Sequence, residues 1–229
     1  MGRAKSFLGP RGNQIRDFGV LTHREKFVIG DKADMFKNLL LIFLTLSFLI
    51  TIYADNLREI KIDNNHSTIG FWVPIMGGLS KVSGKFTDFS IVLNDDSRDI
   101  TKCSVKVVIK TSSIDTGIPA RDAHLKTADF FDTEKFPEIT FESTRIRKQG
   151  KSFVATGNLT MRGVTKEIEL PFDITGKVAT KNLTNIGYAA KLKLNRRDYS
   201  VNWEHPTSPN FVGDEVEVDI RLISKAIKD

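Results

Sequence analysis

Histidine, which often serves as a metal ligand or as a general base near neutral pH, is scarce in this chain. The four histidines are His23, His66, His124 and His205, and each is far from the others in the sequence. No His-x-His or His-x-x-x-His pair occurs, and the single cysteine offers no partner for a zinc site. A Gly-x-Ser-x-Gly nucleophile elbow is also absent from the sequence. We therefore expect no catalytic residue, no metal site and no enzymatic activity.

Arg121, Asp122 and His124 place a guanidinium, a carboxylate and an imidazole within four residues. Two interpretations of this cluster remain open. In the first, Arg121 and Asp122 tether the surrounding segment to the fold, and His124 is hydrogen-bonded nearby. In the second, Arg121 or His124 contacts the polar head group of a ligand, because a guanidinium can form paired hydrogen bonds with an oxyanion.

The cluster lies within a long connection, residues 112–144, in a chain that otherwise has the pattern of β-strands. A Thr-Gly pair predicts a turn, and Pro119 suits the first turn of a helix, so we expect a short helical connection around 119–131. Phe136 precedes a proline and is therefore expected to be extended, which predicts a new strand from about Glu138. Connections of this length inside a compact domain are usually functional or packed on themselves.

Apolar and polar residues alternate with a period of two through most of the chain after Asp55. This pattern predicts about eight antiparallel strands, each with one buried and one solvated face. Arg162-Gly163 predicts a two-residue hairpin, and the absence of long helical segments between strands excludes a parallel βαβ architecture. The fold class is therefore all-β. The alternation fits either a closed barrel or a two-sheet sandwich, and a barrel would leave no exposed edges.

An eight-stranded barrel is either filled by side chains or leaves room for one small ligand. Large inward residues could fill such a core, whereas the small inward residues Ala155, Gly157 and Ala190 would leave space between them. The expected lining residues are Ile69, Phe71, Phe89, Ile91, Val107, Ile109, Phe141, Phe153, Leu159, Met161, Ile168, Leu170, Phe172, Leu192 and Val218.

The net charge of +6 does not indicate a nucleic-acid partner. Residues 1–34 contain seven basic and four acidic residues, and from residue 55 onward basic residues outnumber acidic ones by only two. No basic stripe is present, so we expect no nucleic acid among the partners. Cys103 is the single cysteine, which excludes a disulfide within the chain. It lies in an alternating strand, which favours a half-buried, unreactive thiol.

Residues 39–52 (LLLIFLTLSFLITI) form an apolar run without a charge. A membrane-spanning helix needs about 20 apolar residues, and a shorter run is typical of a signal-peptide core. We therefore predict a signal peptide at 35–54 and a mature chain that begins near Asp55. Residues 1–34 are then a non-native or disordered leader. The alternatives are a retained membrane anchor with a cytoplasmic tail and a buried core helix.

Several spaced motifs after about residue 58 resemble the signature of the YceI-like family. Where that family often has a histidine shortly after the first strand, this chain has Pro-Ile-Met-Gly-Gly at 74–78. The matching motifs are NHSTIGFWV at 65–73, GKF at 84–86, SIDTG at 113–117, RDxHLK at 121–126, DFFDxxxFPxITFxST at 129–144, GNLTMRGVTK at 157–166, RxDY at 196–199 and GDEV at 213–216.

The resemblance implies a single lipocalin-like β-barrel at 55–229 that binds a polyisoprenoid, an isoprenoid quinone or a related amphiphile in the bacterial cell envelope. It favours a barrel over a sandwich. Binding would bury an apolar tail without a covalent step, and the bound lipid would be the chain's only small-molecule ligand. Arg121 and His124 become candidates for contact with its head group. The alternatives are an enzyme that acts on such a lipid and a stress-related envelope scaffold without a ligand.

Location and partners follow from the same expectations. An exported chain would be periplasmic or secreted. A transient membrane contact and a homodimer complete the expected partners.

Overall fold

The computed structural model describes Lys37 and residues 58–95, 99–181, 183–225 and 227–228. The chain divides into a unit Met1–Thr51, of which only Lys37 is described, and a unit Ile52–Asp229, which contains the sheet. The predicted leader and, apart from Lys37, the predicted signal peptide therefore lie outside the described residues. Within the described part of the chain, no helix is both long enough and apolar enough to span a bilayer.

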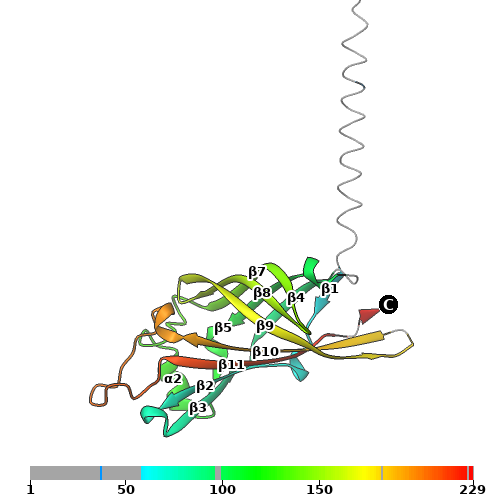
Figure 1. Cartoon of the computed structure of the whole chain (residues 1–229). Coiled ribbons are helices and arrows are strands. Elements are labelled where there is room, and N and C mark those ends of the chain that lie inside the picture. The colour runs from blue at the N-terminus through cyan, green and yellow to red at the C-terminus, as the bar shows by residue number, and fades with distance from the viewer. Residues whose placement is uncertain (1–36, 38–57, 96–98, 182, 226, 229) are drawn as a thin grey trace, which may run out of the picture. The chain divides into compact units, whose positions relative to one another are not determined.

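The described strands form one antiparallel sheet that curls into a half-barrel (Figure 1). Eleven strands follow the order β1-β4-β5-β7-β8-β9-β10-β11-β2-β3-β6, and β12 pairs with β10. The strands are β1 (Arg58–Lys61), β2 (Thr68–Ile75), β3 (Ser80–Phe86), β4 (Phe89–Asp95), β5 (Ser104–Lys110), β6 (Ile114–Asp115), β7 (Glu138–Gln149), β8 (Ser152–Met161), β9 (Val164–Ala179), β10 (Leu183–Asn195), β11 (Glu215–Ile223) and β12 (Ile227–Lys228).

The all-β antiparallel class is confirmed, but the predicted count of eight strands is wrong. Three of the additional strands, β1, β6 and β12, are only two to four residues long and therefore too short to show a period. The fourth, β3, was missed because Gly84 occupies one of its inward positions. A Cβ atom on Gly84 would collide with the ring of Phe71, so this ring fills the space that a β3 side chain would otherwise take.

The predicted closed barrel is also corrected, because the hydrogen-bonded order ends at β1 on one side and at β6 on the other. Two residues, Thr87 and Asp88, join β3 to β4. Their backbone bonds run to the end of β5 and the segment after it: Thr87 N donates to Ser113 O, and Lys110 N donates to Asp88 O. Because these residues bond to that segment, β3 and β4 diverge instead of pairing.

The long connection contains one short helix, α2 (Pro119–Leu125), with proline in its first turn as predicted. The helix ends earlier than residue 131, because Thr127 Oγ1 donates to His124 O and the chain then continues in turns. Strand β7 begins at Glu138, which confirms the predicted boundary. Five 3-10 helices complete the described elements: η1 (Asn64–His66), η2 (Met76–Gly78), η3 (Ile100–Lys102), η4 (Thr111–Ser113) and η5 (Arg196–Tyr199).

Two tight hairpins agree with the sequence pattern. Arg162 and Gly163 link Met161 to Val164 with φ values of 49° and 75°, and a turn with two positive φ angles matches the right-handed twist of the flanking strands. Gly150, with φ at 63°, turns the chain between β7 and β8. These hairpins fix the register of the β7-β8-β9 meander that forms one wall of the half-barrel.

Candidate functional site: an apolar cavity inside the half-barrel

A cavity of about 550 Å³ lies inside the half-barrel. Its walls are almost entirely apolar, and they come from the strands β1 to β11, from α2 and from segment 196–214, which runs from η5 to the start of β11. Small-molecule sites typically have volumes of roughly 300–1,000 Å³ and mainly hydrophobic walls. The cavity therefore has the size and chemistry of a site for an apolar ligand.

The inward side chains differ in burial from strand to strand. On β7 and β8 the inward side chains of Ile139, Phe141 and Leu159 are buried. On β9 the inward side chains of Ile168 and Leu170 alternate with exposed charged residues but are only half-buried. Residues of both groups line the cavity, so the empty volume lies between the β7-β8 side and the β9 side of the interior.

Thirteen of the fifteen residues expected to line the interior do line the cavity. They are Ile69, Phe71, Ile91, Val107, Ile109, Phe141, Leu159, Met161, Ile168, Leu170, Phe172, Leu192 and Val218.

Phe89 and Phe153 are the two exceptions. Phe89 is buried at the start of β4, and Phe153 stacks on Phe172 with ring centroids 5.5 Å apart. Phe89 belongs to the core and Phe153 packs against it, but neither lines the cavity.

Gly157 does not leave space in the cavity, contrary to expectation. A Cβ atom there would collide with Glu142 O and would lie 2.7 Å from Ser143 Cα and 2.8 Å from Phe141 Cζ. The register between β7 and β8 shifts between Ser143 and Arg145, opposite this glycine. Gly157 therefore permits a close approach of two strands at a bulge, whereas Ala155 and Ala190 do line the cavity.

Sequence reasoning missed two kinds of lining residue. Strand residues such as Val73, Val82 and Ile220 follow the same alternation and could have been found from it. Trp203 and Phe211 come from segment 196–214, which has no periodic pattern. No signal in the sequence indicates that these two rings face the interior.

Arg121 and Asp122 both bind Thr116, at the turn before α2. Asp122 Oδ1 accepts hydrogen bonds from Thr116 N at 2.9 Å and from Thr116 Oγ1. Arg121 donates from Nε to Thr116 Oγ1 at 2.7 Å and from Nη2 to Thr116 O at 2.9 Å. This geometry matches the structural interpretation of the cluster. Arg121 also lines the cavity, and Nη1 takes no part in these bonds.

His124 lies at the same end of the cavity, within a group of aromatic rings. Its Nε2 atom is 2.9 Å from Asp129 Oδ2, and its ring meets those of Phe130 and Trp203 edge to face at 5.1 and 5.4 Å. Phe130 and Trp203 are in turn 5.2 Å apart. The imidazole side chain is 43% exposed, so one edge of this lining residue remains accessible.

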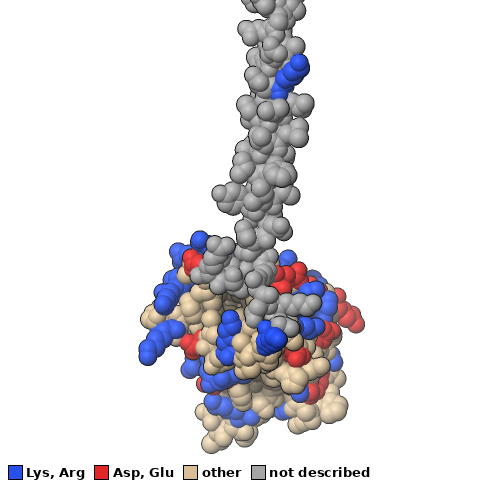
Figure 2. Space-filling view, turned by 90° about the vertical axis from the view of Figure 1, so that its right-hand side faces the viewer, with Lys and Arg blue, Asp and Glu red and all other residues tan. Residues whose placement is uncertain are grey.

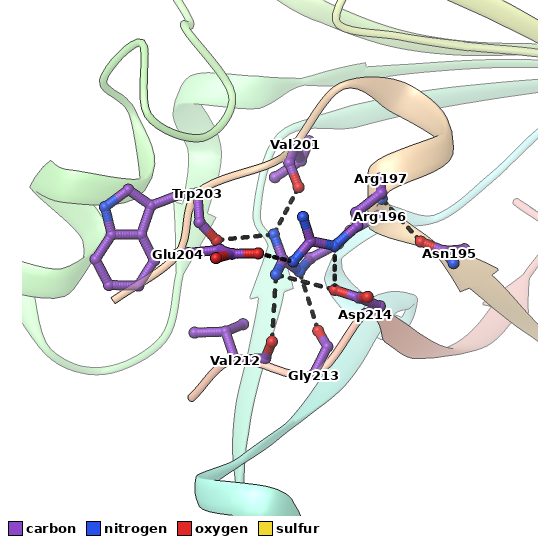
Figure 3. A network of polar contacts seen from close by, with 9 residues as sticks. All are labelled: Asn195, Arg196, Arg197, Val201, Trp203, Glu204, Val212, Gly213 and Asp214. Atoms are coloured by element: carbon purple, nitrogen blue, oxygen red, sulfur yellow. Dashed lines mark hydrogen bonds and ion pairs between the residues drawn. The ribbon is translucent and has the colours of Figure 1, made fainter. Parts of the chain in front are cut away.

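A buried arginine organises segment 196–214 (Figure 3). The Arg196 side chain is 6% exposed, and burial lowers the pKa of its guanidinium. The negative charge of Asp214 acts in the opposite direction but does not cancel the effect of burial. Arg196 donates to four backbone carbonyls and lies 3.0 Å from Asp214 Oδ1. The carbonyl partners, at distances from 2.6 to 3.2 Å, belong to Val201, Trp203, Val212 and Gly213.

The next residue, Arg197, links two acidic residues of the same segment. It donates to Asp214 Oδ1 at 2.7 Å and to Glu204 Oε1 at 2.6 Å, and these bonds raise the pKa of its guanidinium. Arg162 joins this segment to the connection after α2 by donating to Ser200 O and to Ala128 O. The segment that carries Trp203 is thus connected to the β8-β9 hairpin and to the connection after α2.

The fold and the site define a class: an antiparallel half-barrel that encloses one large apolar cavity with basic groups at one end. The described part of the chain contains no cluster of metal-ligating side chains. A model of the YceI-like domain matches residues 60–223, which is more than half of the chain. The chain belongs to the YceI-like family.

Curated relatives agree with this assignment. Protein YceI of Salmonella arizonae is 34% identical over 168 residues, which are 72% of this chain and 87% of the relative. UPF0312 protein plu2095 of Photorhabdus laumondii is 40% identical over 119 residues, which are 52% of this chain. That match spans 62% of the second relative, less than two thirds of its length.

Solved structures share the fold. The YCEI protein of Campylobacter jejuni is 30% identical with a TM-score of 0.56, covering 66% of this chain and 86% of that one. Burkholderia cenocepacia BcnA is 22% identical with a TM-score of 0.65, covering 72% and 99%. A polyisoprenoid binding domain from Saccharophagus degradans is 17% identical with a TM-score of 0.56, covering 73% and 98%. The last two, at low identity, support the fold alone.

Proposed function

We propose that this chain binds a long apolar lipid inside the half-barrel and sequesters or carries it without catalysis. The observation that carries the proposal is the cavity of about 550 Å³ with apolar walls. Its basic lining residues, Arg121, His124 and Arg196, all come from α2 and from η5 at the start of segment 196–214. A site with one polar end suits an amphiphile with a single head group and an apolar tail.

The ligand class that we propose is a polyisoprenoid or an isoprenoid quinone-like amphiphile. Family membership supports this choice, and one solved structure of the same fold is described as a polyisoprenoid binding domain. Burying the tail would contribute roughly 0.8 kcal/mol for each methylene removed from water, so a tail that fills the cavity could bind tightly without many polar contacts.

We propose that the head group lies near Arg121 and His124. Arg121 retains Nη1 beyond its two bonds to Thr116, and one edge of His124 is accessible. Arg196 is a poorer candidate, because its five N–H groups are matched by four carbonyls and Asp214.

The proposed location is the bacterial cell envelope, with the chain exported to the periplasm or secreted. The uncharged run at 39–52 and the envelope location that the family resemblance implies support this proposal. We further propose that the chain acts without a metal or an organic cofactor, and that it contacts membranes transiently to exchange lipid. Self-association as a homodimer remains part of the proposal.

Added bulk inside the cavity provides the test. Ala190→Phe and Val218→Phe place a ring at lining positions, whereas Ala179→Phe makes the same chemical change as Ala190→Phe at an exposed position on β9. Each variant is purified from its own source without detergent, and its lipid is extracted and identified by mass. We expect about one isoprenoid lipid per chain in the parent and in Ala179→Phe, and at least fivefold less in the two cavity variants.

Two results would reject the proposal. A parent without any bound lipid would favour a scaffold without a ligand. A parent that converts the bound lipid to a product of different mass on incubation would favour an enzyme. Thermal unfolding of every variant shows whether lost lipid reflects lost cavity volume or lost folding.

A further inference from the structure

The tip of the β2-β3 hairpin, residues 75–80, exposes apolar side chains that the folded chain does not cover. Leu79 is 84% exposed and Met76 is 51% exposed. Met76, Gly77 and Gly78 all have positive φ, and no heavy atom of another segment lies within 4 Å of a Cβ position on either glycine. The two glycines of the tip therefore stand clear of other segments.

The apolar surface of the tip is continuous with the wall of the cavity. Val73 and Ile75 on β2 and Val82 on β3 line the cavity and are half-buried. Ile75 pairs with Ser80, so the cavity wall extends to the base of the tip. Deep lining residues elsewhere, such as Ile60 and Ile146, are buried. A partly accessible wall beside an exposed apolar tip indicates where a lipid tail can enter.

A second uncharged segment lies beside the tip. Met76 N donates to Phe211 O at 2.8 Å, and Gly213 N donates to Pro74 O at 2.8 Å. Residues 72–80 and 205–213 contain no lysine, arginine, aspartate or glutamate. The nearest charged residue after the tip, Lys81, is paired with Glu217 at 3.3 Å. This face thus offers apolar side chains without unpaired charge.

The opposite end of the half-barrel, viewed in Figure 2, has a different character. Lys and Arg side chains are spread over this face among fewer Asp and Glu side chains (Figure 2). The β7-β8 and β9-β10 hairpins carry the exposed Lys148, Lys151, Lys177 and Lys181. An exposed valine, Val178, lies on the β9-β10 hairpin and is 69% exposed. The two ends therefore predict two different modes of membrane contact: one apolar, the other dependent on anionic lipid.

We propose that Met76 and Leu79 enter the interfacial layer of a lipid bilayer, so that lipid passes between the bilayer and the cavity along the tip. A bilayer suits this surface better than a protein partner does, because the tip is convex, uncharged and continuous with a lipid-sized cavity. The backbone N–H groups of Met76 and Leu79 already have carbonyl acceptors within the chain, which lowers the cost of leaving water. The inference rests on the proposed lipid-binding function.

The test is vesicle flotation with phosphatidylcholine alone and with phosphatidylcholine plus phosphatidylglycerol. We compare the parent with the double variant Met76→Ser/Leu79→Ser and with Val178→Ser, which removes one exposed apolar side chain at the opposite end. We expect the double variant to bind vesicles at least about tenfold more weakly, which corresponds to about 1.4 kcal/mol, and Val178→Ser to bind like the parent. Binding to the two vesicle types should agree within about twofold.

Lipid content separates this inference from the proposed function. The tip variant should keep its lipid, whereas Ala190→Phe should lose its lipid and still float with vesicles. Flotation of a lipid-free parent that depends on the tip would reject the cavity function and leave the docking surface. Three results would overturn the inference. The first is a parent that does not bind vesicles. The second is binding that needs anionic lipid and the third is binding that survives Met76→Ser/Leu79→Ser, and both of these would assign docking to the basic end.

Discussion

Arg121 and Arg196 both line the cavity, but they have different numbers of donors engaged with the chain. Arg196 is buried, and four carbonyls and one carboxylate surround its five N–H groups. Arg121 is half-buried and, within the described part of the chain, bonds to Thr116 alone, through Nε and Nη2. The first arginine therefore holds the segment that carries Trp203, and the second retains capacity to meet a ligand.

Arg196→Lys tests the structural role of the buried guanidinium. An ammonium group has three donors in place of five, so at least two buried acceptors lose their partners, at roughly 1–3 kcal/mol each. We expect the free energy of unfolding in urea to fall by about 2–4 kcal/mol.

Arg197→Lys is the matched control, because its partners Asp214 and Glu204 are partly exposed and exposed ion pairs contribute about 0–1 kcal/mol. Equal losses in the two variants would show that burial of Arg196 does not stabilise the segment.

Among the elements, β7 and β8 approach closely at Gly157, where a Cβ atom would lie against backbone atoms of β7. Gly157→Ala would force a methyl group against Glu142 O and Ser143 Cα in the neighbouring strand. Backbone atoms of a sheet cannot move aside as a flexible side chain can, so we expect a loss of about 1–3 kcal/mol in the free energy of unfolding.

Gly176→Ala on β9 is the matched control, since no atom lies within 4 Å of its Cβ position. There we expect no loss, or a gain of up to about 1 kcal/mol from the less flexible unfolded chain. The pair of variants is compared by urea unfolding. A Gly157→Ala variant as stable as Gly176→Ala would contradict the close strand approach.

The elements also show what a sequence pattern can and cannot predict. Long strands such as β9 repeat the period often enough to be recognised, and the Arg162-Gly163 turn contains a glycine, which adopts positive φ readily. β3 lacks a recognisable pattern because the Phe71 ring, from the neighbouring strand, fills the space above Gly84. The inward position of Trp203 depends on hydrogen bonds that Arg196 donates to the carbonyl of Trp203 and to carbonyls elsewhere in segment 196–214. Local patterning therefore could not predict this part of the site.

At the scale of the whole half-barrel, inward apolar side chains from the strands β1 to β11 surround the cavity. Buried isoleucine, leucine and phenylalanine side chains line it on β4, β5, β7 and β8, together with the half-buried Leu93, Val105 and Val107. The β9 wall has inward residues that are only half-buried, and Ala190 supplies a small side chain on the adjacent strand β10. Protein interiors are normally packed as densely as organic crystals, so a persistent apolar void of this size is expected to have an occupant.

A crystal structure of the chain purified from its own source, without exposure to detergent, tests the central claim most directly. We predict continuous electron density for one apolar tail along the cavity, beside Ala190 and Val218, with its polar end near Arg121 and His124. A cavity that contains only water, or that is closed by repacked side chains, would contradict the proposal that the half-barrel carries a lipid.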